Sequence, residues 1–177
     1  HKNIYLLEEA RGLRMIDSAL TNVKTLFRSN NGLSRVRTLS FSPTWDTLYI
    51  TNDQGDDKGI STVIATPASG FTRWNAITYS RQCNGGDVQP QTGDYFFNSY
   101  ANGQVYQYDR ATRTVREHYR IGDNQWEFNI QFSPTGDFAY IVSVNRHYVL
   151  KVDYNRNTRT LETAVHFVGQ RAGEGPH

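Results

Sequence analysis

Short segments in which apolar and polar residues alternate recur along this chain. In Phe128 to Phe132 every second residue is apolar, and Val36 to Phe41 has a similar pattern. A period of two places the apolar side chains on one face of a β-strand. Only the stretch from Tyr5 to Ala19 also fits a helix, and its agreement with the repeat described next favours strands there too. The pattern therefore predicts an all-β protein.

One of these segments is repeated. Ser42 to Ile50 (SPTWDTLYI) returns as Ser133 to Ile141 (SPTGDFAYI), and Gln89 to Phe97 (QPQTGDYFF) is a more divergent copy. In each copy Pro and Asp form a polar turn that leads into an apolar strand. The shared Thr residues are spaced 48 and 43 residues apart. Periods of about 20–50 residues indicate a repeat architecture.

Each copy of the motif lies between a first and a second strand, and two more strands follow before the next copy. The second strands are predicted at 48–51, 95–98 and 138–142, the third at 60–65, 104–108 and 148–152, and the fourth at 71–79, 115–121 and 161–168. Asp109 and Asp153 are expected to end two of the third strands. The start of the chain supplies only three strands, at 3–7, 13–16 and 23–27.

Tandem four-stranded antiparallel units are typical of a β-propeller, in which each unit is one blade. The predicted blades cover residues 1–29 (incomplete), 30–80, 81–123 and 124–177. An aromatic content of 13% agrees with sheets that are buried on both faces. The single Cys83 excludes an internal disulfide and a zinc site built from several thiolates. The net charge of +2 and the dispersed Arg residues disfavour nucleic-acid binding, and no apolar run is long enough for a transmembrane segment.

Several segments resemble NHL-type propeller repeats: Asn3-Ile4-Tyr5, Gly12 to Asp17, Gly136 to Tyr140 and Val149 to Asp153. The segment from Phe167 to Pro176 (FVGQRAGEGP) is similar to the Gly-rich linker that precedes a blade in that family. The combination resembles the propeller part of TIG/NHL surface proteins of Gram-negative gut bacteria, and the resemblance covers essentially the whole chain. WD-type and YVTN-type propellers are the alternatives.

The resemblance implies a closed ring that usually has six blades, of which this chain supplies about four. We therefore expect a piece of a longer six-bladed protein; a ring completed by a second chain and a four-bladed ring are the alternatives. It also implies an extracytoplasmic location, in the periplasm or at the cell surface. Proteins of this type are often encoded near glycan-uptake systems.

In a propeller, the loops that lead into the first strands and those between the second and third strands share one face, where ligands usually bind. Trp126 offers an aromatic plane beside the hydrogen-bonding groups of Glu127 and Asn129, a combination that suits sugars. Asn52, Tyr100 and Arg146 lie in other predicted loops of this face, and the segment 82–87 is predicted to be one of the loops that lead into the first strands. These six residues are the candidate ligand-binding site, and packing is the alternative role for Trp126.

A second loop on that face carries Asp53, Asp56 and Asp57, oxygen ligands that would suit calcium. Their spacing does not match an EF-hand loop, so a solvated turn is the favoured interpretation and no cofactor is expected. No G-x-S-x-G motif is present. Cys83 is interpreted as a packing residue and His147 as a surface residue, so no catalytic residue is predicted.

The predicted function is a non-enzymatic binding or scaffold propeller of an exported bacterial surface protein, with a glycan or a protein as its partner. The alternative is a metal-dependent hydrolase that resembles lactonases and gluconolactonases. Such enzymes bind a divalent metal in the channel through Glu, Asn and Asp. Residues of those types in this chain are Glu127, Asn129, Asn84, Asp87 and Asn52.

Overall fold

The computed structural model describes residues 3–8, 12–27, 34–54, 59–66, 70–78, 83–99, 103–120, 127–143 and 147–169. These residues form strands and turns, and none of them lies in a helix. The strands of the first two sheets are β1 (Ile4–Glu8), β2 (Gly12–Ile16), β3 (Val23–Phe27), β4 (Ser34–Phe41), β5 (Thr47–Gln54), β6 (Gly59–Thr66) and β7 (Gly70–Thr78). Those of the other two are β8 (Cys83–Val88), β9 (Tyr95–Ser99), β10 (Gln104–Asp109), β11 (Thr114–Arg120), β12 (Glu127–Phe132), β13 (Phe138–Ser143), β14 (Tyr148–Asn155) and β15 (Thr160–Gly169).

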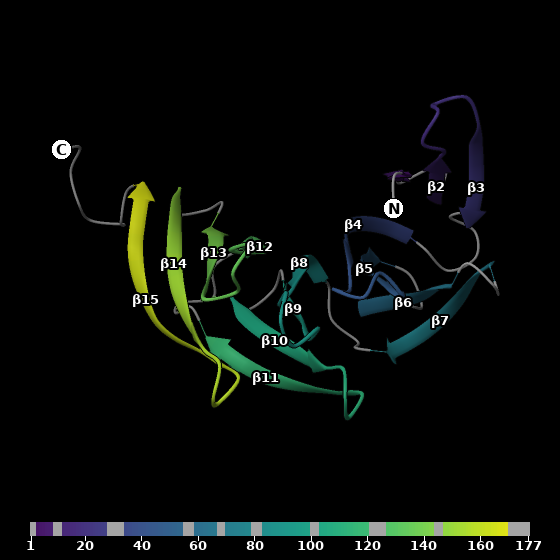
Figure 1. Ribbon diagram of the computed structural model, residues 1–177. Helices are drawn as coiled ribbons and strands as arrows, with labels where there is room; N and C mark the ends of the chain where they lie inside the picture. Colours follow the sequence, from purple (N-terminus) through teal and green to yellow (C-terminus); the bar gives the residue numbers. More distant parts are fainter. Residues whose placement is uncertain are drawn as a thin grey trace.

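The strands form one three-stranded sheet, β1–β3, and three four-stranded sheets, β4–β7, β8–β11 and β12–β15. Within each sheet, every strand pairs antiparallel with the next one along the chain. Figure 1 shows the sheets following one another round an arc, with β4, β8 and β12 packed together on its inner side. The all-β prediction and the four-stranded antiparallel units are confirmed.

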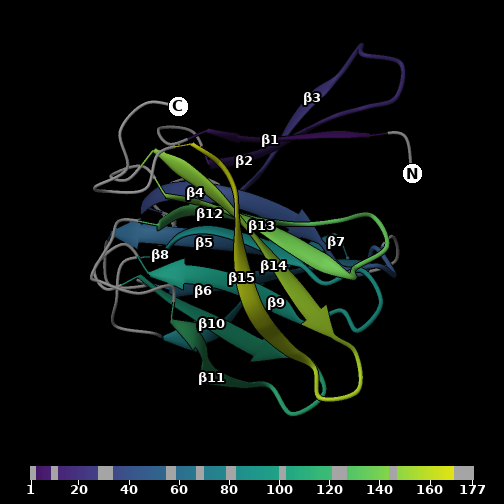
Figure 2. The ribbon, with the colours of Figure 1, turned by 90° about the vertical axis from the view of Figure 1, so that its left-hand side faces the viewer.

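This topology gives each four-stranded sheet two distinct ends. The first-to-second and third-to-fourth turns lie at one end, which we call the turn end, and the second-to-third connections lie at the other, the loop end. Figure 2 shows the β12–β13 and β14–β15 turns together at the turn end. Ligand groups at the two ends therefore belong to different faces of the molecule.

The repeated motif forms the same turn in each sheet. Backbone hydrogen bonds join Ser42 to Thr47, Gln89 to Asp94 and Ser133 to Phe138 at 2.8–2.9 Å. In two copies the turn needs a left-handed residue, which is Gly93 or Gly136. Trp45 adopts the same conformation with φ 60° in the third copy.

The β10–β11 and β14–β15 turns are each closed by a side chain that accepts two backbone N–H groups. Asp109 accepts from Ala111 and Thr112 at 2.8 and 3.0 Å, as expected for the last residue of β10. The prediction that Asp153 ends the third strand of the last sheet is wrong. There β14 continues to Asn155, which accepts from Asn157 and Thr158. An amide oxygen closes this turn in the same way as a carboxylate oxygen does. The expectation of an Asp at the strand end therefore placed that end at the wrong residue.

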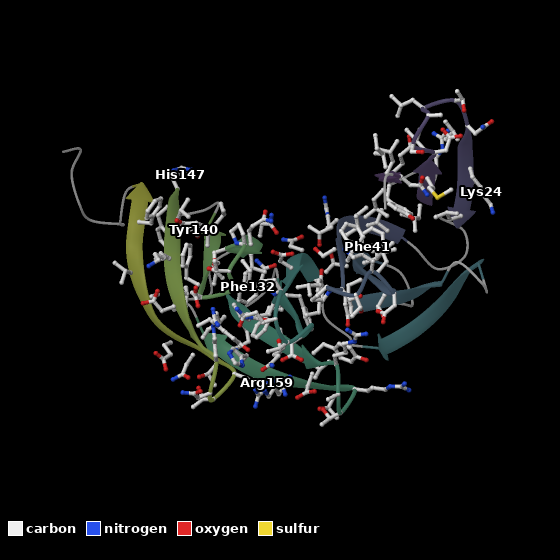
Figure 3. All side chains as sticks on the ribbon, in the orientation of Figure 1. Lys24, Phe41, Phe132, Tyr140, His147 and Arg159 are labelled. Atoms are coloured by element: carbon white, nitrogen blue, oxygen red, sulfur yellow. The ribbon has the colours of Figure 1, made fainter. Side chains whose placement is uncertain are left out.

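The core lies between the sheets rather than at one centre. Stacked rings of Tyr49 and Tyr95, with centroids 4.8 Å apart, join β4–β7 to β8–β11. Phe96 packs edge-on against Phe132 and Tyr154 between β8–β11 and β12–β15, and Figure 3 shows Phe132 in this position. The aromatic residues thus connect consecutive sheets, which is how propeller blades are stabilised.

The opposite face of β12–β15 also carries apolar side chains. Tyr140 lies between Phe138 and Phe167, with ring centroids 5.3 and 5.0 Å away, and Figure 3 shows it on β13. Phe167 is 58% exposed. Both faces of this sheet are therefore apolar, as expected for a propeller blade.

His118 connects two sheets through a hydrogen bond that requires a neutral ring. Its Nε2 accepts the backbone N–H of Leu161 at 2.7 Å, and burial lowers its pKa from 6.5 to about 4. Because the unfolded chain binds a proton more readily than the folded one, the free energy of unfolding is expected to fall as the pH drops from about 6.5 toward 4.

Urea denaturation at pH 7 and pH 5 measures this effect. The wild type should lose stability over that interval, and His118→Gln, which does not titrate, should lose clearly less. An equal loss in both proteins would contradict the assignment to His118.

Candidate functional site

The predicted ligand residues that the structure describes lie in strands and not in loops. Asn52 lies in β5, and Glu127 and Asn129 lie in β12. The backbone pairs Asn52 with Val36 and Asn129 with Val142, so the ladder continues through polar positions that sequence reasoning assigned to loops. The predicted loop position of these residues is therefore wrong, and their role in binding stays a prediction. Tyr100, Trp126 and Arg146 lie outside the described residues.

The acidic loop is only partly described. Asp53 belongs to β5, so its predicted loop position is wrong, and Asp56 and Asp57 lie outside the described residues. Among the residues that the structure describes, no three His, Cys, Asp or Glu side chains are grouped so as to hold a metal ion. The solvated turn expected at these aspartates and its calcium alternative both stay predictions. His147 is an exposed turn residue.

The segment 82–87 was predicted to be a loop, but the structure forms β8 from Cys83 to Val88. Gly85 and Gly86 made it look like a turn, although β8 pairs with β9 and packs between β4 and β12. Gly86 is needed because a Cβ atom there would lie 2.3 Å from the Tyr95 hydroxyl oxygen. Glycine in this strand marks a close approach of Tyr95, not a turn.

Three buried polar side chains lie at the loop end of the strands on or next to the inner side. Asn84 lies near the start of β8, Asn98 lies near the end of β9, and Ser143 is the last residue of β13. Their exposed fractions are 2%, 0% and 1%. We call them the loop-end donors. Asn84 Nδ2, Asn98 Nδ2 and Ser143 Oγ have no hydrogen-bond partner within the described part of the chain.

Hydrogen bonds fix the surroundings of these groups. Asn98 Oδ1 accepts the backbone N–H of Gly85 at 2.7 Å, so the orientation of the Asn98 amide is determined and its Nδ2 is the group left over. The Thr51 hydroxyl donates to the carbonyl oxygen of Asn84 at 3.2 Å and accepts from the backbone N–H of Thr38 at 3.1 Å. The backbone of Asn84 and the side chain of Asn98 are therefore held by a hydrogen-bond network that joins β4, β5, β8 and β9.

Buried polar groups without partners are costly, at about 1–3 kcal/mol each, and are uncommon in native proteins. Three of them at the same end of neighbouring sheets indicate positions prepared for an external partner. Two amide N–H groups and a hydroxyl recognise acceptor oxygens, such as those of hydroxyl-rich molecules. The arrangement suits binding rather than nucleophilic chemistry.

Asp87, which follows Asn84 along β8, connects the inner strands. Its carboxylate accepts the backbone N–H of Phe132 and of Val88, both at 2.8 Å, and the Ser40 hydroxyl at 3.2 Å. Burial raises the pKa of Asp87 despite these donors. The carboxylate therefore ties β4, β8 and β12 together, and all its contacts are structural.

Asn98 and Ser143 were not among the predicted site residues. The sequence carried a signal for Asn98, since it follows the buried run Tyr95-Phe96-Phe97 inside a strand. A polar residue that continues a strand buried on both faces is expected to be buried too. Ser143 follows exposed Val142 and gave no such signal.

Comparison with protein-family models and with curated protein sequences finds no match. Several solved structures are similar to the chain. An auxiliary nutrient binding protein from Bacteroides thetaiotaomicron is 32% identical with a TM-score of 0.84; the match covers 99% of this chain and 41% of that one. A second auxiliary nutrient binding protein, from Bacteroides ovatus, is 24% identical with a TM-score of 0.80 over 98% of this chain and 40% of its own.

A Bacteroides thetaiotaomicron protein provisionally assigned as a phosphatase is 21% identical, with a TM-score of 0.83 over 98% of this chain and 44% of its own. The chain thus spans less than half the length of these three proteins. A gluconolactonase from Xanthomonas campestris is more distant, at 15% identity and a TM-score of 0.60, and shows the fold alone. The similarity therefore does not favour the lactonase-like alternative.

The structure and these similarities agree on the fold. The chain has propeller-like architecture and is similar over nearly its whole length to part of two Bacteroides auxiliary nutrient binding proteins. Within the described segments, no helix is long and apolar enough to cross a membrane. The NHL type, the TIG domain and the six-bladed ring stay predictions.

Proposed function

We propose that this chain is part of a non-enzymatic, extracytoplasmic binding protein that holds a hydroxyl-rich nutrient, such as a glycan, at the loop end. The observation that carries the proposal is the set of loop-end donors, Asn84, Asn98 and Ser143, which are buried without a protein partner in the described structure. Such groups gain hydrogen bonds only when a polar molecule reaches them. The ligand is bound by these donors and needs no metal ion.

Two further observations support the proposal. Two similar Bacteroides proteins are auxiliary nutrient binding proteins, and one of them shares 32% identity over 99% of this chain. The predicted residues Asn52, Glu127 and Asn129 lie toward the loop end of their strands, the same end as the loop-end donors. A protein is the alternative partner at this end. We infer that the chain belongs to the class of NHL-type surface proteins.

A glycan array of neutral oligosaccharides, followed by calorimetric titration of the best ligand, tests this function. Ser143→Ala removes a hydroxyl that has no protein partner, so it should leave the melting temperature unchanged and weaken binding about threefold to tenfold. Asn84→Ala should weaken it as well. Addition of EDTA should leave the affinity unchanged.

Ser133→Ala is the matched control, because it removes a buried serine hydroxyl at the turn end of the same sheet. It should bind the oligosaccharide like the wild type. Binding that survives both Ser143→Ala and Asn84→Ala would contradict the proposed site, and the absence of any glycan or protein ligand would contradict the function.

A further inference from the structure

A cleft of about 510 Å³ lies at the turn end, on the opposite side from the loop-end donors. It is lined by Thr92 of the β8–β9 turn, Arg110 and Ala111 of the β10–β11 turn, and Arg159 of the β14–β15 turn. Figure 3 shows Arg159 where β14 and β15 meet β10 and β11. The volume is in the range of small-molecule sites, and the cleft takes its walls from two consecutive sheets.

Both guanidinium groups of the cleft are held by carboxylates. Arg159 donates from Nε to Asp94 Oδ2 at 3.1 Å and pairs with Asp109 at 3.3 Å. Arg110 donates to both oxygens of Asp46 at 3.0 and 2.8 Å. Asp94 has no exposed surface, whereas the two arginine side chains are about one third exposed. A molecule that enters the cleft therefore meets preorganised guanidinium edges.

A third arginine adds positive charge beside the cleft. Arg116 donates from one guanidinium nitrogen to Gln107 and to the carbonyl oxygen of Arg159, at 2.6 and 3.4 Å. A guanidinium group has five N–H donors, and the described contacts of Arg110 leave its Nε free for another acceptor. The charges of the three arginines are balanced by Asp46, Asp94 and Asp109, so it is the unused guanidinium N–H groups that favour a carboxylate as the acceptor.

The hydroxyl of Tyr154 gives an independent sign of a ligand. Tyr154 is only 6% exposed, and its hydroxyl has no hydrogen-bond partner among the residues that the structure describes. The side chains of Thr92 and Arg159, which line the cleft, and the carboxylate of Asp94 lie near this hydroxyl, but within the described residues none of them makes a hydrogen bond of acceptable geometry with it. A buried phenol hydroxyl without a partner at the wall of a cleft is placed to bond to a molecule inside it.

We propose that this cleft binds a small hydroxylated carboxylate, for example a uronic acid. The ligand carboxylate accepts hydrogen bonds from the exposed N–H groups of Arg110 and Arg159. A ligand hydroxyl forms hydrogen bonds with the hydroxyl groups of Tyr154 and Thr92. The site is separate from the loop-end donors and does not depend on the function proposed for them.

Calorimetric titration of the whole chain with D-glucuronate tests the site, with D-glucose as the neutral ligand of the same shape. Glucuronate should bind saturably and glucose should not. Tyr154→Phe removes only the hydroxyl and is expected to keep the melting temperature while weakening glucuronate binding about tenfold. Arg110→Gln should weaken it at least as much.

Arg113→Gln is the control, since Arg113 is an exposed residue of the same turn that does not line the cleft. It should change the affinity less than twofold, and Ser143→Ala at the loop end should not change it. The proposal is overturned if glucuronate does not bind, if glucose binds equally well, or if folded Tyr154→Phe binds glucuronate like the wild type.

Discussion

Replacing Arg159 by Ala is expected to lower the free energy of unfolding by about 3–5 kcal/mol, because it leaves a fully buried carboxylate without its counter-ion. Asp94 has no exposed surface and lies between β8–β11 and β12–β15. After the change, the side chain of Gln107 and the backbone N–H of Arg110 remain as its donors, at 2.7 and 3.1 Å. Neither of these groups carries a charge.

Urea denaturation followed by circular dichroism measures the loss. Arg156→Ala is the matched control, because Arg156 pairs with Asp137 in the neighbouring part of the sheet and both side chains are about half exposed. An exposed pair contributes about 1 kcal/mol or less. Adding Asp94→Asn to Arg159→Ala removes the buried charge and should restore part of the stability. Equal losses for Arg159→Ala and Arg156→Ala would show that Asp94 is not held by Arg159.

This contact illustrates what the repeat could and could not predict. Asp46 and Asp94 occupy the same place in the repeated turn, and each accepts an arginine from the next sheet, Arg110 or Arg159. The aspartates were visible in the sequence as turn residues. Their partners lie 64 and 65 residues further along, in turns whose side chains have no fixed spacing in the motif. Only the packing of consecutive sheets brings them together.

The strands themselves were largely predictable because their pattern and their turns agree. The exception is β8, in which Asn84, Gly85, Gly86 and Asp87 are all residues typical of turns. Pairing with β9 and packing against the inner strands override that local preference. The same segment carries Asn84, so the predicted loop also gave no sign that this side chain is buried.

The predicted ligand residues and the loop-end donors lie at the same end of the sheets but in different classes of position. Sequence reasoning looked for exposed loop residues, whereas the unpartnered donors Asn98 and Ser143 are buried at strand ends. Whether a buried amide has a partner depends on atoms from other sheets, such as the N–H of Gly85 that occupies Asn98 Oδ1. A one-dimensional pattern does not contain that information.

Gly86→Ala is expected to destabilise the protein by about 3 kcal/mol, the upper part of the range for overpacking a rigid core. The added Cβ would lie 2.3 Å from the Tyr95 hydroxyl oxygen and 2.8 Å from the carbonyl oxygen of Phe96. Tyr95 cannot easily move, since its ring stacks on Tyr49 and it has no exposed surface. The carbonyl oxygen belongs to the backbone of β9, so its movement would disturb the pairing of β8 and β9.

Chemical denaturation of the single and double variants separates the two clashes. Gln131→Ala, at an exposed position of neighbouring β12, is the control and should change the free energy of unfolding by about 0.5 kcal/mol or less. In the Gly86→Ala background, Tyr95→Phe removes the closest clashing atom and should recover part of the loss, although it also removes the contact of the hydroxyl with Thr38. The contacts of the added Cβ with the ring carbon Cζ of residue 95 at 2.5 Å and with the Phe96 carbonyl oxygen at 2.8 Å remain, so recovery should be incomplete. A Gly86→Ala protein as stable as the wild type would show that β8 does not pack this closely against Tyr95.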